Sequence, residues 1–298
     1  MRLSIPQRWF YIWITITFSF VHPTYTQAGV TWNRLIKADD KPGGKASSAV
    51  RLLRKCSLCL FNQDNFDPDK VRVVDQQNEN IILRMPNPSI DGEFRENKLY
   101  DAIRTAVPSW KGPDDSEIVV FNLMHRWAEF EEYVVEKSWF DAHPEHKFKY
   151  FPQLGSLLPS TWVPGLLRKL LYKWDRHLLL RARVVVDALH DELSTLGEKP
   201  KIIILHCVSG RDRTGFIDGL YQMTYNEKSY ESVVKVNQEV AGKPQDFYSR
   251  NSLRWEALRL IEEGYSHVGE KQAVLDYDDK DTAYFQRQLS VSKKQKKH

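Results

Sequence analysis

Cysteine is scarce in this chain, with three among 298 residues. Two of them form Cys56-Ser57-Leu58-Cys59, but a second Cys-x-x-Cys pair and nearby histidines are missing, so a zinc site is not expected. That pair could close a local disulfide, which would leave Cys207 as the free thiol. We expect no metal and no cofactor.

Long apolar runs are also missing. The segment Trp9–Val21 is uncharged and apolar over 13 residues, whereas a membrane-spanning helix needs about 20. Arg2 and Arg8 supply charge at its start, and Thr26-Gln27-Ala28 supplies small residues before a cleavage point. We therefore interpret residues 1–28 as a signal peptide, with a retained anchor as the alternative. The chain is expected to be secreted or in the lumen of the secretory pathway.

Internal repeats, a linker and a nucleic-acid-binding module are not evident, and the sequence gives no indication of an oligomeric state. The predicted organisation is a loose N-terminal segment at 29–48, one domain at 49–266, and a polar, disordered tail at 267–298. The formal net charge of +4 is modest, and much of it lies in the basic end of the tail, Lys293–Lys297. Such a tail is usually solvated, although it could contact an anionic membrane surface.

Between these ends the hydrophobic pattern predicts an α/β domain. Short apolar runs at 71–74, 81–85 and 118–123 are typical of strands. Apolar residues recur at helical spacing over 178–196, just before the strand-like run Lys201–Leu205, and again over 253–261. A helix that precedes a buried strand is the crossover arrangement of a sheet covered by helices.

The most informative segment follows that strand: His206-Cys207-Val208-Ser209-Gly210-Arg211-Asp212-Arg213-Thr214-Gly215. A helix-like run, Phe216–Met223, comes directly after it. A strand, a tight loop and a helix start place successive backbone N–H groups around one anion at the positive end of the helix. Residue frequencies give odds of about one in a million for this combination by chance.

This geometry predicts a nucleophile and its helpers. Thiols at helix N-termini beside cationic groups ionise far more readily than free cysteine, so Cys207 would attack phosphorus as a thiolate. Arg213 would hold two equatorial phosphate oxygens with its planar guanidinium. Thr214 would donate a hydrogen bond to the sulfur as it leaves. Gly210 and Gly215 allow a close approach that side chains would obstruct.

The segment resembles the cysteine-dependent protein tyrosine phosphatase superfamily, whose hallmark is His-Cys-x5-Arg-Ser/Thr. Within it, the loop is most similar to the branch with Gly-Lys-Asp-Arg-Thr-Gly loops, although Arg211 replaces the usual lysine. The resemblance is clear over 202–223 and looser from 71 to 264. It implies a central mixed, largely parallel sheet flanked by helices, and a phosphoric monoester hydrolase with a thiophosphate intermediate. The loop residues that would bind the substrate phosphate are Val208, Ser209, Gly210, Arg211, Asp212 and Arg213.

Three aspartates are candidates for the general acid. Tyrosine phosphatases keep it on a Trp-Pro-Asp loop, but the corresponding stretch here has Gln153 and Leu154 after its proline. Asp212 matches an aspartate inside the loop of related phosphatases and is our first candidate. Asp175 and Asp141 are alternatives, and a salt bridge that only braces the loop is a further role for Asp212.

The substrate is expected to be a phosphorylated protein, with phosphotyrosine ahead of a phosphoinositide. Phosphoinositide phosphatases often place cations one and four positions after the cysteine, and here only Arg211 fits, since the first position is Val208. His206 is predicted to support the loop rather than to react. An aromatic group is expected to be core more than pocket: Trp127, Tyr133, Trp139, Phe140, Tyr150 and Phe151. A different class, an inactive secreted phosphate-binding module, remains the alternative.

Overall fold

The computed structural model describes residues 66–90, 92–126, 129–153, 160, 163–164, 167, 182–242 and 244–277. They belong to one unit, Gln63–His298. The expected signal peptide, the loose segment and the Cys56–Cys59 pair lie outside these residues. In the part of the chain that is described, no helix is both long and apolar enough to cross a membrane.

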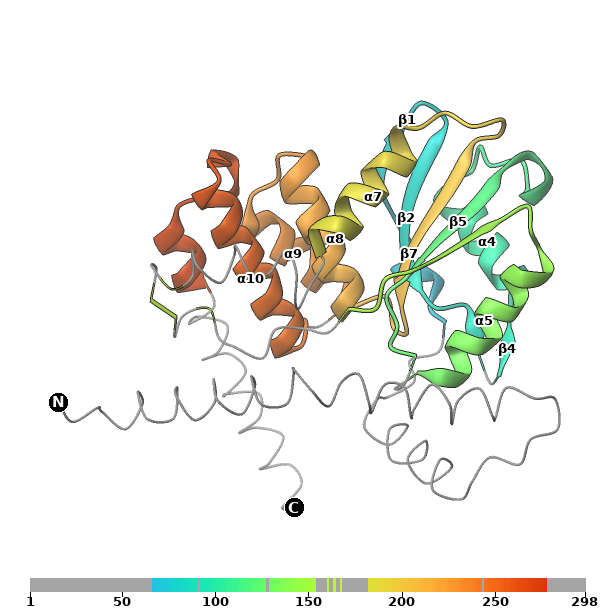
Figure 1. Ribbon diagram of the computed structural model, residues 1–298, viewed down its shortest axis with the longest axis horizontal. Coiled ribbons are helices and arrows are strands. Elements are labelled where there is room, and N and C mark those ends of the chain that lie inside the picture. Colours follow the sequence, from blue (N-terminus) through green and yellow to red (C-terminus); the bar gives the residue numbers. More distant parts are fainter. Residues whose placement is uncertain are drawn as a thin grey trace, which may run out of the picture. The chain divides into compact units, whose positions relative to one another are not determined.

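A five-stranded sheet forms the centre of the described domain, with the strand order β1-β2-β7-β5-β6 (Figure 1). The pairs β2–β7, β7–β5 and β5–β6 are parallel, whereas β1 pairs with β2 in the antiparallel sense. This confirms the predicted fold class of a central mixed, largely parallel sheet. The strands are β1 Arg72–Gln77, β2 Asn80–Pro86, β5 Glu117–Asn122, β6 Lys147–Tyr150 and β7 Lys201–Cys207.

Helices cover both faces of this sheet. In Figure 1, α4 and α5 lie on one side, and α7 to α10 lie on the other. The helices are α4 Glu96–Ala106, α5 Phe130–Ala142, α7 Ala182–Ser194, α8 Asp212–Tyr225, α9 Tyr230–Ala241 and α10 Phe247–Glu262. Short elements complete the described part: β3 Ser89–Ile90, β4 Glu93–Phe94, and the 3-10 turns η1 Pro68–Lys70, η2 Pro113–Asp115 and η4 Ser266–Val268.

The side chains of β7 alternate between two hydrophobic cores, one on each face of the sheet. Every residue of β7 is buried. Ile203 and Leu205 join the core cluster under α7 to α10, while Ile202 and Ile204 join the cluster under α4. Alternate side chains of a strand point to opposite faces, so a run that is apolar throughout is needed where helices cover both.

The predicted end of the domain at 266 is wrong. Residues 271–277 are helical, and Val274 is buried in the same core cluster as Val268. The ring of Tyr277 lies 5.9 Å from that of Tyr230 on α9. These apolar side chains anchor the segment despite its polar surroundings. Residues 278–298 lie outside the described part.

Candidate active site

The predicted strand, loop and helix are present in the predicted order. Strand β7 ends at Cys207, and α8 begins at Asp212. Gly210 lies between them with φ 64°, a left-handed conformation that glycine adopts without a steric penalty. A Cβ atom there would lie 2.5 Å from the backbone carbon of Met85, so this position also requires a residue without a side chain.

The Cys207 thiol lies at the bottom of this loop. The residue is only 2% exposed and is a free cysteine. The Thr214 hydroxyl donates a hydrogen bond to its sulfur at 3.2 Å. Thr214 is itself fully buried.

The first turn of α8 contains backbone N–H groups that the helix itself does not pair. Its N-cap residue, Arg211, makes no side-chain capping hydrogen bond. The Gly215 N–H bonds to the Arg211 carbonyl, which marks the start of the helical pattern. The N–H groups of the preceding residues have no helical acceptor, because a helix leaves its first N–H groups unpaired. Together with the helix dipole, they favour an anion at this end of α8.

Arg213 is held in place by a carboxylate. Its Nη1 lies 3.0 Å from Glu129 Oε2, and its Nη2 lies 2.5 Å from Glu129 Oε1. Its Nη1 also donates to the Leu123 carbonyl at 3.4 Å. These contacts use three of the five guanidinium N–H donors, and the Nε edge remains for a phosphate. Burial opposes the charge, but the Cys207 sulfur and Glu129 outweigh it and raise the pKa of Arg213.

The helix that supplies Glu129 does not bring Asp141 to the site. Glu129 is the N-cap of α5, and Asp141 is in its last turn. Twelve residues of helix extend about 18 Å. Asp141 instead forms an exposed ion pair with Lys137. The alternative that gave Asp141 the general-acid role is therefore wrong.

The carboxylate of Asp212 is engaged on both oxygens. Oδ2 accepts from Arg211, with Nε at 3.0 Å and Nη2 at 2.9 Å. Oδ1 accepts the Asp246 N–H at 2.7 Å. These contacts are those of a loop brace, one of the two roles considered for Asp212. Its role as a proton donor stays a prediction.

The other candidate for the acid, Asp175, lies outside the described residues, as do Trp127 and Leu154. Gln153 is described and is buried, with its N–H bonded to the Leu123 carbonyl at 3.2 Å. Because Arg213 also contacts that carbonyl, the segment after β6 starts beside the loop.

The imidazole of His206 lies between the loop and α5. It is fully buried, with Nε2 2.8 Å from Glu136 Oε1 and Nδ1 3.2 Å from the Cys207 carbonyl oxygen. Asn122 donates to the other Glu136 oxygen at 2.6 Å. These contacts place the imidazole between α5 and the end of β7, and the supporting role of His206 stays a prediction.

His125 lies near the Arg213–Glu129 pair. Its backbone N–H donates to Glu129 Oε2 at 2.6 Å. Burial, together with the Arg213 charge, lowers the pKa of His125. Glu129, which contacts both groups, supplies the carboxylate that balances the guanidinium.

Gly215 allows two side chains to reach the first turn of α8. A Cβ at this position would lie 2.6 Å from Gln245 Nε2 and 2.9 Å from Asn237 Oδ1. Asn237 donates to the Gly215 carbonyl at 2.8 Å, and Gln245 donates to the Asp212 carbonyl at 2.9 Å. Both contacts hold the start of α8, and a larger residue at Gly215 would displace them.

The aromatic residues mostly form core. Tyr133 and Phe140 are buried, and the Tyr133 ring lies 4.9 Å from Tyr150 and 5.8 Å from Phe148. Phe151 stacks on Phe121 at 5.4 Å. The preference for core over pocket is confirmed for Tyr133 and Phe140, which are buried, and for Phe151, which packs against the core.

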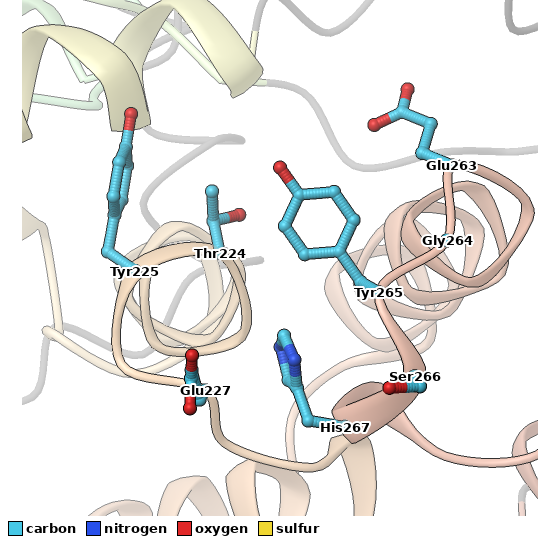
Figure 2. A pocket seen from close by; sticks show the side chains of 8 residues that line it. All are labelled: Thr224, Tyr225, Glu227, Glu263, Gly264, Tyr265, Ser266 and His267. Atoms are coloured by element: carbon cyan, nitrogen blue, oxygen red, sulfur yellow. The ribbon is translucent and has the colours of Figure 1, made fainter.

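A cavity of about 380 Å³ lies elsewhere, at the C-terminal end of α8. Figure 2 shows Tyr265 and His267 across from Thr224 and Tyr225. Twelve residues of helix separate Thr224 from Asp212, or about 18 Å. This cavity is therefore distinct from the Cys207 loop.

No protein-family model and no curated protein matches the sequence. Among solved structures, a kinase associated phosphatase whose catalytic cysteine is replaced by serine is 10% identical, with TM-score 0.38, over 67% of this chain and 97% of that one. The core catalytic domain of the PP-IP phosphatase Siw14 from S. cerevisiae is 15% identical, with TM-score 0.36, over 72% and 96%. A PTP-like phytase from Bdellovibrio bacteriovorus is 14% identical, with TM-score 0.35, over 72% and 90%. These scores are low, so the chemistry of this chain has to be inferred from its own loop.

Sequence reasoning missed the residues that hold the loop from a distance. Glu129 is the N-cap of α5 and Glu136 lies within that helix; both are far from the motif in sequence, and neither belongs to a recognisable pattern. Arg84 and Asp218 did carry a signal, because each is a charged residue inside an apolar run.

Proposed function

We propose that this chain is a cysteine-dependent phosphatase that hydrolyses phosphate monoesters, with phosphotyrosine as the favoured substrate. The observation that carries the proposal is the contact between Thr214 Oγ1 and Cys207 Sγ, 3.2 Å long, at the uncapped start of α8. A binding module would need the N–H groups and Arg213, but it would not need a hydroxyl that stabilises a leaving sulfur.

In the first step, the Cys207 thiolate attacks phosphorus. The S–P bond forms, the bond from phosphorus to the substrate oxygen breaks, and that oxygen takes a proton. The loop N–H groups and Arg213 stabilise the charge on the equatorial oxygens, and positioning supplies much of the rate.

In the second step, water attacks phosphorus and the S–P bond breaks. Inorganic phosphate leaves, and the sulfur recovers its electron pair as a thiolate. The Thr214 hydrogen bond stabilises that developing charge.

Asp212 is our candidate for the group that protonates the leaving oxygen. Since Arg211 and the Asp246 N–H both donate to its carboxylate, Asp212 would have to give up one of these contacts and take a proton from solvent before it could deliver that proton to the leaving oxygen. Water is the alternative donor when the leaving group is a good one.

The pairing of Arg211 supports phosphotyrosine over a phosphoinositide. Arg211 is the one extra cation that the loop sequence offers, and it lies 2.9 Å from Asp212. A ligand with several phosphates would have to compete with that carboxylate. Phosphotyrosine carries a single phosphate group, which needs only the loop N–H groups and Arg213.

The test is turnover of the full chain on a panel of phosphotyrosine peptides, phosphoserine peptides and phosphoinositides. Cys207→Ser is the matched control, because it removes the nucleophile and should keep binding of a phosphate analogue. Equal hydrolysis by both proteins would overturn the mechanism. Binding without turnover by the unaltered chain would favour the inactive phosphate-binding module, and turnover of inositol lipids alone would reassign the substrate.

We also propose that the chain enters the secretory pathway through residues 1–28. The composition of this segment supports the proposal. N-terminal sequencing of protein recovered from culture medium tests it, with a start near residue 29 expected. A membrane-embedded product that begins at Met1 would favour an anchor.

A further inference from the structure

Arg84 is a buried cation with three partners on three different elements. It lies on β2, is 1% exposed, and is among the largest fully buried side chains of the described part. Its Nη1 donates to Asp218 Oδ2 on α8 at 2.6 Å and to Asn237 Oδ1 on α9 at 2.5 Å. Its Nη2 donates to the carbonyl oxygen of Gly210, in the loop after Cys207, at 3.0 Å.

The stability of the folded domain does not by itself explain the buried ion pair of Arg84 and Asp218. Asp218 balances the charge of Arg84, and both side chains are almost fully buried. Removing two charges from water costs about as much as their attraction returns, so apolar residues of similar volume often serve equally well. The contact with the Gly210 carbonyl is what an apolar side chain could not make.

The end of β2 holds the loop at a second carbonyl. The Asn87 N–H donates to the carbonyl oxygen of Val208 at 3.0 Å. Gly210 packs so closely on the backbone of Met85 and Pro86 that a Cβ would approach within 2.6 Å of both. Two loop carbonyls, those of Val208 and Gly210, are thus directed toward β2 and its continuation.

The direction of these carbonyls fixes the direction of two N–H groups. In a trans peptide the C=O and the following N–H point in opposite directions, and the described residues contain no cis peptide bond. The N–H groups of Ser209 and Arg211 therefore point away from β2. Both belong to the stretch expected to bind the substrate phosphate.

We propose that Arg84 is a positioning residue that keeps the Gly210–Arg211 peptide oriented with its N–H toward the bound phosphate. Glycine populates both signs of φ, so this peptide could rotate and turn its carbonyl oxygen toward the anion. The guanidinium holds that oxygen on the opposite side. The inference rests on the proposed function, because it assumes that the loop binds a phosphate group.

The test is the affinity of the full chain for inorganic phosphate, measured by calorimetry in a Cys207→Ser background so that turnover is not involved. The main variant is the double substitution Arg84→Met with Asp218→Leu, which leaves no buried charge unpaired. The matched control is Lys201→Met with Glu192→Leu. Lys201 lies 2.8 Å from Glu192, is 5% exposed at its side chain, and begins β7 at the end opposite to Cys207.

We expect the Arg84 double variant to bind phosphate about 10- to 100-fold more weakly, the effect of losing one charge-assisted hydrogen bond. The control pair should not change the affinity. Thermal melts without phosphate verify that both proteins fold. If the double variant does not fold, Arg84→Lys replaces it: an ammonium keeps the charge for Asp218 but cannot reproduce the planar, multi-point contact, so weaker binding is again expected.

Unchanged phosphate affinity in a folded Arg84 variant would overturn this inference and leave the proposed function intact. An equal loss in the Lys201 control would also overturn it, because it would indicate a general effect of packing. Absence of phosphate binding by the Cys207→Ser parent would overturn the proposed function and this inference together.

Discussion

Replacing Thr214 by valine tests the role of the hydroxyl at the sulfur. Valine matches the shape of threonine but has no donor. Thr214 is fully buried and its Oγ1 lies 3.2 Å from Cys207 Sγ, so valine can fill the same space while removing this hydrogen bond. The perturbation is therefore confined to one contact.

The two chemical steps should respond differently. In the second step negative charge develops on the sulfur, and a hydrogen bond to a charged group contributes about 1.5–3 kcal/mol. Its loss should slow breakdown of the thiophosphate by about 10- to 150-fold, since about 1.4 kcal/mol corresponds to tenfold in rate. In the first step charge leaves the sulfur, so formation of the intermediate should not be slowed to the same degree.

Rapid-mixing kinetics with an activated aryl phosphate separate the two steps. Thr214→Val should release the aryl group in a burst approaching one equivalent per enzyme, followed by a slow steady state. The phosphorylated protein should be detectable by mass spectrometry after an acid quench. Thr214→Ser is the control, because it keeps the hydroxyl and should retain most of the breakdown rate.

Two results would refute this reasoning. One is a Thr214→Val protein whose steady-state rate and burst match those of the unaltered chain. The other is an equal slowing of both steps, which would indicate a displaced loop rather than a missing hydrogen bond.

Arg213→Lys should lower kcat/KM by about 10²- to 10³-fold, because an ammonium cannot make the planar two-point contact; a near-normal rate in steady-state assays would contradict this. Asp212→Asn, compared with Asp175→Asn, should cost about 10²-fold more on an alkyl phosphate than on an activated aryl phosphate if Asp212 is the acid. An equal loss on both substrates would make Asp212 a brace, and a selective loss at Asp175 would transfer the role. Burial, with Arg213 nearby, lowers the pKa of His125, and burial lowers the pKa of His146. The unfolded chain therefore binds more protons as the pH falls below about 6.5, so the free energy of unfolding should decrease from about pH 7 to pH 5. Urea titrations of a His125→Gln, His146→Gln double variant should show a smaller decrease, and an unchanged slope would refute the assignment.

The sequence was most informative where structure and chemistry are local. The run Lys201–Leu205, the turn at Gly210 and the start of α8 are consecutive in the chain, so their patterns could be read directly. Strands β1, β2 and β5 were also placed correctly, because short apolar runs rich in Val and Ile are typical of strands.

Long-range partners could not be predicted in the same way. Glu129 lies 84 residues before Arg213, and only the packing of α5 against the sheet brings them together. Asp141 failed as a candidate for the same reason, because it occupies the other end of that helix. Helical periodicity does not indicate which end of a helix faces a distant loop.

Charges inside apolar runs were a signal that sequence reasoning did not use. Arg84 interrupts the run 81–85, and Asp218 interrupts the start of α8. Buried charges are rarely tolerated without a partner, so two of opposite sign in predicted core elements could have been paired in advance. In the structure Arg84 and Asp218 do form an ion pair, with 2.6 Å between Nη1 and Oδ2.

The central position of β7 in the sheet determines when its residues unfold. Its neighbours β2 and β5 pair with it on both sides, and all of its residues are buried. Amide hydrogens in such a strand exchange with solvent only when the whole domain unfolds, whereas edge strands and peripheral helices exchange through smaller openings. Cys207 is the last residue of β7, so it belongs to the strand that unfolds last. Local unfolding would first release the peripheral helices and loops that surround Cys207. The thiol would then keep its position on β7 while the rest of the site is lost.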